Sequence, residues 1–364
     1  MPSKSRRKSL EPRNAGIEAS SGGSLEAPFA KGSFPCHRLD VPLSERAWWR
    51  SIRSSLQHVK AVIFSLYEGN YHQGVASLIN SAIGTGFGGC FIVGYRDSVP
   101  PWAQTLKSVS DDEYMVGENR IVFYKVHATR HLGYHKPFIA LELLEKFPEI
   151  ERLFYADPDV TFVAPWQFFD QWVDLGLALV EDSNFPRVSP NHPWRAVWKD
   201  LLDRAGLKAD SSEGQSYVNS GFFGMTRRDR DFLKAWADVT LTFEATGQST
   251  GDFDMVERWK AVVGDQDLLA AVMMHWAGPV SIMGPEAMGF TGYYFILSHA
   301  IESPKPWDKS YFLSSLNGVP PTPAGGNFLQ AAAGPIQLFP KSAYLLRRLD
   351  YKAAKLVSRV WRRA

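Results

Sequence analysis

The sequence predicts an α/β fold in which helices flank a mixed, mainly parallel sheet. Short apolar and aromatic runs alternate with amphipathic stretches, which is the pattern of strands connected by helices. Examples are residues 90–93, 121–126, 136–146 and 153–155. With 364 residues, 45% of them hydrophobic, the chain is long enough to bury one large core, and no internal repeat divides it.

Composition divides the chain into four predicted segments. Residues 1–45 are rich in Ser, Gly, Pro and basic side chains and lack the apolar run of a secretion signal, so we expect a disordered tail. Residues 58–312 form the main domain. A Pro- and Gly-rich connecting segment, residues 313–340, then leads to a basic amphipathic helix at residues 341–364.

The main domain opens with a predicted strand at residues 61–66 and a predicted helix at residues 73–83. The glycines of residues 84–89 have the Gly-x-Gly-x-x-Gly spacing of dinucleotide-binding loops. That fingerprint must follow a strand and begin a helix, whereas these glycines follow a helix and precede the strand at residues 90–93. We interpret them as a loop that ends the helix.

An apolar run at residues 153–156 ends in Asp157-Pro158-Asp159, which predicts a buried strand that carries two carboxylates at its end. Two like charges this close are costly to bury without a positive partner, most simply a divalent metal ion. Parallel sheets bind ligands at the carboxyl ends of their strands, where these acids lie. This feature makes an enzyme the leading interpretation.

Two alternatives compete for this motif. Asp157-x-Asp159-x-Thr161 also fits the aspartyl-phosphate pattern of haloacid-dehalogenase-type phosphatases, although in those enzymes the nucleophilic strand usually opens the domain. The other alternative is an ordinary strand-end turn with solvated acids.

A second polar motif, His299 to Trp307, follows an apolar run at residues 293–297. An imidazole is a good ligand for manganese-class metals when carboxylates complete the site, and the point charge of Lys305 suits a diphosphate. Together with Asp157 and Asp159, these residues indicate a metal-bridged nucleotide diphosphate. Taken alone, the histidine would be a surface or core residue and Lys-Pro-Trp an ordinary loop.

Over residues 61–310 the chain resembles the retaining glycosyltransferases of family 8, which include glycogenin and bacterial lipooligosaccharide galactosyltransferases. The family's late signature is His-x-x-Gly-x-x-Lys-Pro-Trp, and this chain keeps His299, Lys305, Pro306 and Trp307 in register. It has Glu302 where glycine is usual, and glycine would let the backbone approach a diphosphate closely. The resemblance implies a GT-A-type fold and a metal site of Asp157, Asp159 and His299.

The resemblance also implies which residues hold the nucleotide. Ser65, Tyr67 and Tyr71 look like the family's first strand and nucleotide-binding turn, and Lys136 looks like its lysine near the donor. Without the resemblance, the tyrosines are equally well read as loop residues and Lys136 as a solvated charge at a helix N-terminus.

Four further positions resemble the family's residues around the donor sugar. Asp182 and Asn219 would contact the sugar, whose hydroxyls need both acceptors and donors of hydrogen bonds. Asp265 would bind sugar hydroxyls, and Gln266 would lie near the anomeric carbon, where its amide oxygen supports developing positive charge. The structural alternatives are a bulge or turn at Asn219 and a helix cap at Asp265.

Composition bounds the location and partners of the chain. Only Cys36 and Cys90 are present, and no apolar stretch is long enough to span a bilayer, so we expect a cytoplasmic protein in a reducing compartment. The C-terminal segment combines apolar residues with many cations, which favours a membrane-surface helix at the inner face over a helix packed on its own domain. The cations are Arg347, Arg348, Lys352, Lys355, Arg359, Arg362 and Arg363. No nucleic-acid-binding module is recognisable.

The sequence therefore predicts a retaining glycosyltransferase that uses Mn²⁺ or Mg²⁺ and a nucleotide-activated hexose, UDP-glucose or UDP-galactose. The acceptor would be a saccharide or a glycolipid. Two other classes stay open. They are the aspartyl-phosphate phosphatase and a catalytically silent nucleotide-sugar-binding protein, the latter because of Glu302.

Overall fold

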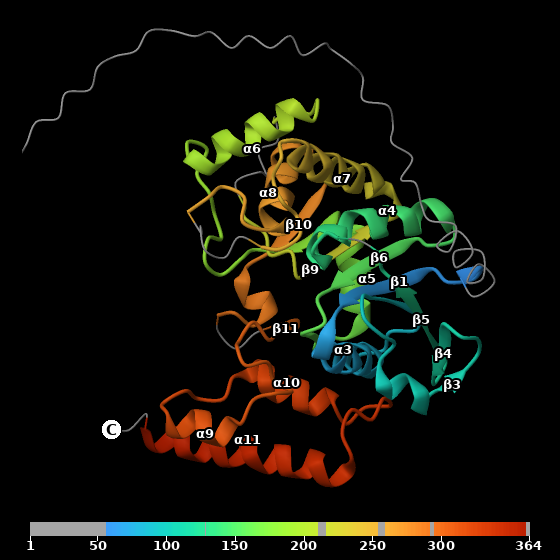
Figure 1. The fold of residues 1–364 in the computed structure, drawn as a ribbon, viewed down its shortest axis with the longest axis vertical. Helices are drawn as coiled ribbons and strands as arrows, with labels where there is room; N and C mark the ends of the chain where they lie inside the picture. Colours follow the sequence, from blue (N-terminus) through green and yellow to red (C-terminus); the bar gives the residue numbers. More distant parts are fainter. Residues whose placement is uncertain (1–55, 128, 210–215, 254–258, 292–294, 362–364) are drawn as a thin grey trace, which may run out of the picture. The chain divides into compact units, whose positions relative to one another are not determined.

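The computed structural model describes residues 56–127, 129–209, 216–253, 259–291 and 295–361 (Figure 1). These residues belong to one compact unit, Ser44–Ala364. The predicted tail of residues 1–45 lies outside the described residues, as do Tyr293 and Tyr294 of the run before His299.

A nine-stranded sheet forms the centre of the described residues, with the order β10-β8-β9-β6-β1-β2-β5-β4-β3 (Figure 1). Polar and apolar residues alternate little along the inner strands, as expected of strands covered on both faces. The strands are β1 (Ala61–Tyr67), β2 (Cys90–Tyr95), β3 (Lys107–Ser108), β4 (Glu113–Val116), β5 (Asn119–Lys125), β6 (Arg152–Ala156), β8 (Leu177–Val180), β9 (Phe222–Thr226) and β10 (Val280–Met283).

The prediction of a mixed sheet is confirmed, but the nine-stranded sheet is not mainly parallel, because four of its eight strand pairings are antiparallel. Strands β6, β1, β2 and β5 are parallel neighbours, and β10 is parallel to β8. However, β9 runs antiparallel to both β6 and β8, and β4 runs antiparallel to β3 and β5. The β4–β5 hairpin turns at Gly117, whose φ of +61° lies in the left-handed region that glycine adopts without strain.

Helices cover both faces of the sheet, so the prediction of an α/β fold with flanking helices is confirmed. One face packs against α3 (His72–Gly84) and α5 (Trp166–Asp174). The other packs against four helices. These are α4 (Lys136–Lys146), α6 (Pro193–Arg204), α7 (Arg230–Ala245) and α8 (Asp265–His275).

Alternation along β1 explains how one strand serves both cores. Successive side chains of a strand point to opposite faces of the sheet. Val62 and Phe64 therefore pack in the core under α4, α6, α7 and α8, whereas Ile63 and Tyr67 pack in the core under α3 and α5. Full burial of each such side chain contributes about 1.5–3 kcal/mol. The two cores hold the strand ends, and hence the polar residues that follow them, in fixed positions.

The glycine-rich loop ends α3, as predicted. The helix stops at Gly84, Gly86 adopts a φ of +103°, and β2 starts at Cys90. A helix therefore precedes the loop and a strand follows it, which is the reverse of a dinucleotide-binding fingerprint.

Three further helices follow the sheet: α9 (Tyr311–Leu316), α10 (Pro323–Ala331) and α11 (Lys341–Trp361) (Figure 1). They share a small core of their own that includes Trp307. The predicted connecting segment, residues 313–340, therefore contains α10 and part of α9. The side chain of Asn80 on α3 bonds the backbone of Ala331 and Ile336, which joins these helices to the main domain.

No helix within the described ranges is long and apolar enough to cross a bilayer. Cys90 is a buried free thiol, and Cys36 lies outside those ranges.

The buried imidazole of His135, in the turn before α4, makes stability depend on pH. Burial, followed by the charges of Arg130 and Arg96, lowers the pKa of His135 to about 4. The unfolded chain, with an ordinary histidine pKa of about 6.5, binds the proton first as the pH falls. The contribution of His135 is therefore fully present above pH ~6.5 and is lost as the pH falls toward ~4, by about 2–3 kcal/mol of unfolding free energy.

We expect His135→Asn to remove this part of the pH dependence, because the amide does not titrate. Urea unfolding of the parent and the variant between pH 7 and pH 4 measures the difference. His58→Gln, at an exposed imidazole, is the control and should keep the parent's slope. An unchanged slope in His135→Asn would contradict the assignment.

Candidate functional site

The turn after β6 places the two predicted acids side by side. Asp157 is anchored by its backbone N–H, which donates to the carbonyl of Gly221 at 2.8 Å, and its own carbonyl accepts from Val160 at 2.9 Å. Gly74 on α3 lies directly beneath the turn, because a Cβ there would be 2.2 Å from the carbonyl oxygen of Pro158. The close approach of α3 therefore fixes the turn.

A two-stranded ribbon carries His299 to the same place. Strand β7 (Val160–Phe162) pairs antiparallel with β11 (Leu297–His299), and the register sets His299 opposite Val160. The N–H of Ala300 donates to the carbonyl of Asp159 at 2.9 Å, so the pairing continues past the strand end. This ribbon explains how residues some 140 positions apart meet.

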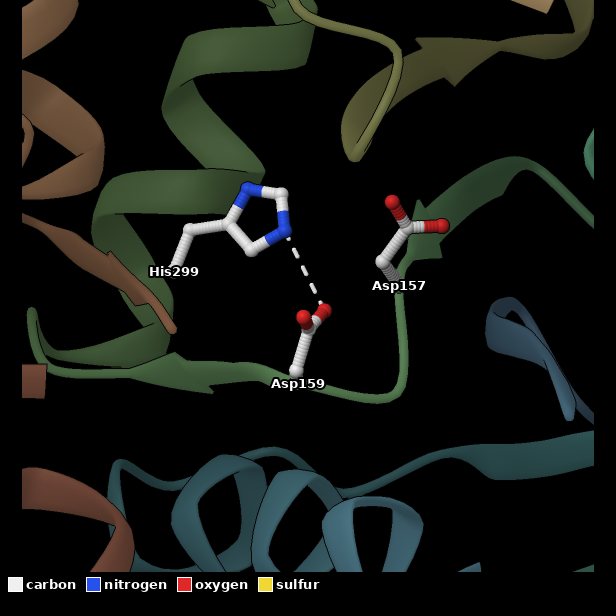
Figure 2. Close-up of side chains that lie close together, drawn as sticks. All are labelled: Asp157, Asp159 and His299. Atoms are coloured by element: carbon white, nitrogen blue, oxygen red, sulfur yellow. Dashed lines mark ion pairs between the residues drawn. The ribbon is translucent and has the colours of Figure 1, made fainter. Parts of the chain in front are cut away.

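Asp157, Asp159 and His299 each offer one potential metal ligand atom, and these atoms lie within 4.8 Å of one another. In Figure 2 the imidazole of His299 faces Asp159, and Asp157 lies beside them. Nε2 of His299 lies 3.1 Å from Oδ1 of Asp159. Asp159 and His299 are buried, whereas the side chain of Asp157 is 26% exposed. The cluster is therefore open on the Asp157 side.

The donor atoms fit a divalent cation. Two carboxylates and one imidazole suit Mn²⁺ or Mg²⁺, with remaining positions left for water or phosphate oxygens. The absence of a side chain at Gly221 keeps the space beside the cluster open for a cation. A Cβ at this position would lie 2.5 Å from Cε1 of His299 and 3.0 Å from Oδ2 of Asp157. Any larger residue at position 221 would close the cluster.

Lys305 lies against the same carboxylate. Its Nζ is 2.6 Å from Oδ2 of Asp159 and 2.8 Å from the carbonyl of Ala300. Burial alone would raise the pKa of Asp159, but His299 and Lys305 outweigh it and hold that pKa well below its ordinary value. Asp159 is therefore a carboxylate at neutral pH, and a cation already lies beside it.

Tyr71, one of the predicted nucleotide contacts, lies beside Lys305. Nζ of Lys305 is 5.8 Å from the centre of its ring, which packs edge-to-face on Trp307. Tyr67 is buried, and its hydroxyl donates to the carbonyl of Ser98 at 2.5 Å. Ser65 is also buried in β1, and its hydroxyl has no hydrogen-bond partner among the described residues.

Lys136 is buried between two acids rather than solvated. Its Nζ lies 2.8 Å from Oδ2 of Asp265 and 3.3 Å from Oδ1 of Asp157, and it donates to the carbonyl and hydroxyl of Ser220 at 3.0 and 3.2 Å. The hydroxyl of Tyr155 also donates to Asp157. Burial favours the neutral amine, but Asp157 and Asp265 together raise the pKa of Lys136. The solvated-charge alternative is therefore excluded.

The predicted sugar-binding residues form a second group joined to this one by Ser220. The amide of Asn219 donates to Asp182 at 3.0 Å, and its carbonyl oxygen accepts from the N–H of Gly221 at 2.9 Å. Oε1 of Gln266 accepts from the N–H of Ser220 at 3.1 Å. The segment of residues 219–221 thus connects the sugar-binding candidates with the acids at the end of β6.

The structure excludes the structural alternative for Asp265 at the start of α8. Asp265 does not cap the helix, because it occupies the first helical position and pairs with Lys136. Asp267 caps it instead, and its Oδ2 accepts from the N–H groups of Val263 and Gly264 at 2.7 and 3.0 Å. The carboxylate of Asp265 is therefore free to pair with Lys136.

Glu302 does not direct its carboxylate at the acids. It pairs with buried Lys309 at 2.6 Å and accepts from the hydroxyl of Thr322 at 2.8 Å. None of the described non-glycine residues has a positive φ, so the backbone at Glu302 does not require glycine. The substitution thus links the loop to α10 without adding negative charge beside Asp159.

Sequence reasoning missed Tyr155, Ser220 and Gly221 as members of the site. A signal existed for Tyr155, because residues two apart on a strand share a face and Tyr155 precedes Asp157 by two. Ser220 and Gly221 were visible only as neighbours of Asn219, and their contacts depend on the tertiary structure.

No protein-family model matches the chain, and no curated protein matches it in sequence. The resemblance to family-8 glycosyltransferases accordingly rests on the motifs themselves.

The ion pair between Lys136 and Asp265 should be strongly coupled. We expect Lys136→Met to lower the free energy of unfolding by about 3–5 kcal/mol, because it leaves two carboxylates without their cation. The double variant with Asp265→Asn should lose less than the sum of the single losses, with a coupling energy of about 1–3 kcal/mol.

Urea unfolding of the parent, the two single variants and the double variant gives this coupling. The exposed pair Lys60–Glu151 is the matched control, and its removal should change stability by less than about 1 kcal/mol. Additive losses at Lys136 and Asp265 would show that the buried pair is not an energetic unit.

Proposed function

We propose that this protein is a metal-dependent retaining glycosyltransferase of GT-A type. The donor is a nucleotide-activated hexose, UDP-glucose or UDP-galactose, and the acceptor is a saccharide or a glycolipid. The observation that carries the proposal is the convergence of Asp157, Asp159 and His299 with Lys305 at one open cluster. The resemblance to family 8 supplies the reaction class.

The proposed roles follow from chemistry and position. Asp157, Asp159 and His299 would hold Mn²⁺ or Mg²⁺, which when bound neutralises charge on the diphosphate. Lys305 adds a fixed positive charge at the same place. Tyr71 borders Lys305 and offers a ring surface to the nucleotide.

The sugar would lie over the segment of residues 219–221. Asn219 and Asp182 present an amide and a carboxylate, which match the mixed donors and acceptors of sugar hydroxyls. Asp265 and Gln266 lie at the N-terminus of α8, where Gln266 contacts the backbone of Ser220. Gln266 is a poor nucleophile, but its amide oxygen can stabilise positive charge at the anomeric carbon.

In the proposed reaction, the bond from the anomeric carbon to the phosphate oxygen breaks, and its electron pair leaves with the nucleotide diphosphate. The acceptor hydroxyl forms the new bond from the same face of the sugar. Because the new bond forms on the face that the phosphate leaves, the configuration at the anomeric carbon is retained. The proton of the acceptor hydroxyl passes to an oxygen of the departing phosphate, so no basic side chain is needed.

Charge balance supports a cation at this site. Among the described residues, three carboxylates, Asp157, Asp159 and Asp265, contact two ammonium groups, those of Lys136 and Lys305. The remaining partner is the imidazole of His299 beside Asp159, which must be neutral to bind a metal. A diphosphate would bring further negative charge against this group, which electrostatics opposes unless a divalent cation accompanies it.

We expect UDP to bind with Mn²⁺ and to bind much more weakly without it. Asp159→Ala should reduce metal-dependent UDP affinity by at least about tenfold, since even outer-shell changes cost 10–100-fold at metal sites. Calorimetric titration of UDP, UDP-glucose and UDP-galactose measures this. Asp174→Asn, at an exposed acid paired with Arg152, is the control and should bind like the parent. Metal-independent binding, or none at all, would overturn the proposal.

The phosphatase alternative makes a different prediction. The third residue of its motif, Thr161, is buried in β7 and bonds the carbonyl of Ser298, so it does not line the open side of the cluster. We therefore expect no release of phosphate from p-nitrophenyl phosphate with Mg²⁺, by the parent or by Asp157→Asn. Phosphate release by the parent that disappears in Asp157→Asn would favour the phosphatase.

A further inference from the structure

The outward face of α11 is built only from apolar and basic side chains, apart from one serine. Five large apolar residues are exposed, among them Leu346 at 67% and Val360 at 71%. At 3.6 residues per turn they fall within an arc of roughly 100° on the helix. They are Leu345, Leu346, Leu349, Leu356 and Val360.

Five exposed cations lie along one edge of this arc. By the same helical geometry they occupy roughly the 60° of the helix surface next to Leu345. They are Lys341, Arg348, Lys352, Lys355 and Arg359. Large apolar groups beside a row of cations are typical of helices that lie at the surface of anionic membranes.

The opposite face of α11 is already occupied, so the apolar arc is not needed for packing within the chain. Ala354 is buried in the small core with Trp307 and Phe328, and the hydroxyl of Tyr351 donates to the carbonyl of Thr322 at 2.8 Å. Asp350 is the only acid of the helix. Its carboxylate accepts from the first N–H groups of α9, those of Tyr311 and Phe312, at 2.7 and 3.1 Å.

The orientation of Asp350 decides the charge of the outer face. This carboxylate is used to satisfy the N-terminus of α9 and is only partly exposed, so the fully exposed side chains of α11 include no acid. Helix α9, which packs against α11, adds further exposed apolar side chains, Leu313 and Leu316. Figure 1 shows α9 and α10 along one side of α11 and none of the labelled elements along its other side.

We propose that this face of α11 docks on an anionic lipid bilayer. The apolar arc would enter the boundary between headgroups and acyl chains while the cations contact anionic headgroups. A second copy of this chain is a poorer occupant, because each copy would bring the same row of cations to the interface and no fully exposed acid of α11 to oppose them. Arg362 and Arg363 lie outside the described residues, as does the side chain of Trp361, and the proposal does not depend on them.

Sedimentation with vesicles tests the proposal on the full chain. We expect binding to vesicles of phosphatidylcholine with phosphatidylglycerol, weaker binding in high salt, and much weaker binding to phosphatidylcholine alone. Leu346→Asp with Leu349→Asp, and separately Lys352→Glu with Arg359→Glu, should each reduce binding by at least about tenfold. Leu175→Asp, at an exposed leucine of the main domain, is the matched control and should bind like the parent.

Three outcomes would overturn the proposal. The first is equal binding to neutral and anionic vesicles, and the second is parent-like binding by the folded charge-reversal variant. The third is no vesicle binding by a dimeric parent that becomes monomeric in the leucine variant, which would assign the face to a second copy. Circular dichroism checks folding, and the charge-reversal variant changes only exposed side chains. The assay needs no nucleotide, so its failure and a failure of the proposed transferase function are separable.

Discussion

The ammonium group of Lys136 holds together the parts of the chain that make the site. It lies at the start of α4 and contacts the acid at the end of β6, the acid at the start of α8 and the backbone before β9. Ion pairs in the protein interior are favourable only when every buried charge has a partner, because an unpaired buried charge is costly. The four segments are therefore constrained to meet at one point, and the positions of Asp157, Ser220 and Gln266 follow from that constraint.

The C-terminal helices extend this network outward. Trp307 packs beside Tyr71 near the cluster and also belongs to the small core of α9, α10 and α11. Glu302 adds a second link, since Lys309 and Thr322 both contact its carboxylate. A glycine at this position could make neither contact. The residue that departs from the family signature thus stabilises the attachment of the helices whose outer face we propose to dock on lipid.

Local sequence patterns predicted most of the strands and helices, whereas features that depend on tertiary contacts were not predicted. The strand at β1, the helix at α4 and the end of α3 were visible because apolar periodicity and glycine act over a few residues. The antiparallel direction of β9 was not visible, because strand direction depends on the path of the chain between β8 and β9. At the site, Asp157 and Asp159 stood out by spacing, whereas the burial of Lys136 depends on partners 21 and 129 positions away.

Lys305 carries a positive charge beside the candidate metal site. Its pKa is raised, because Asp159 outweighs the effect of burial, so it stays an ammonium ion at neutral pH. Nζ already contacts Asp159, and the ring of Tyr71 lies on another side of it. With His299 on the other oxygen of Asp159, this carboxylate has two positively polarised neighbours, whereas Asp157 remains partly exposed. A diphosphate that approached from the open side would therefore meet Asp157, whose ammonium partner, Lys136, is shared with Asp265. The remaining repulsion is the physical reason to expect a further cation beside Asp157.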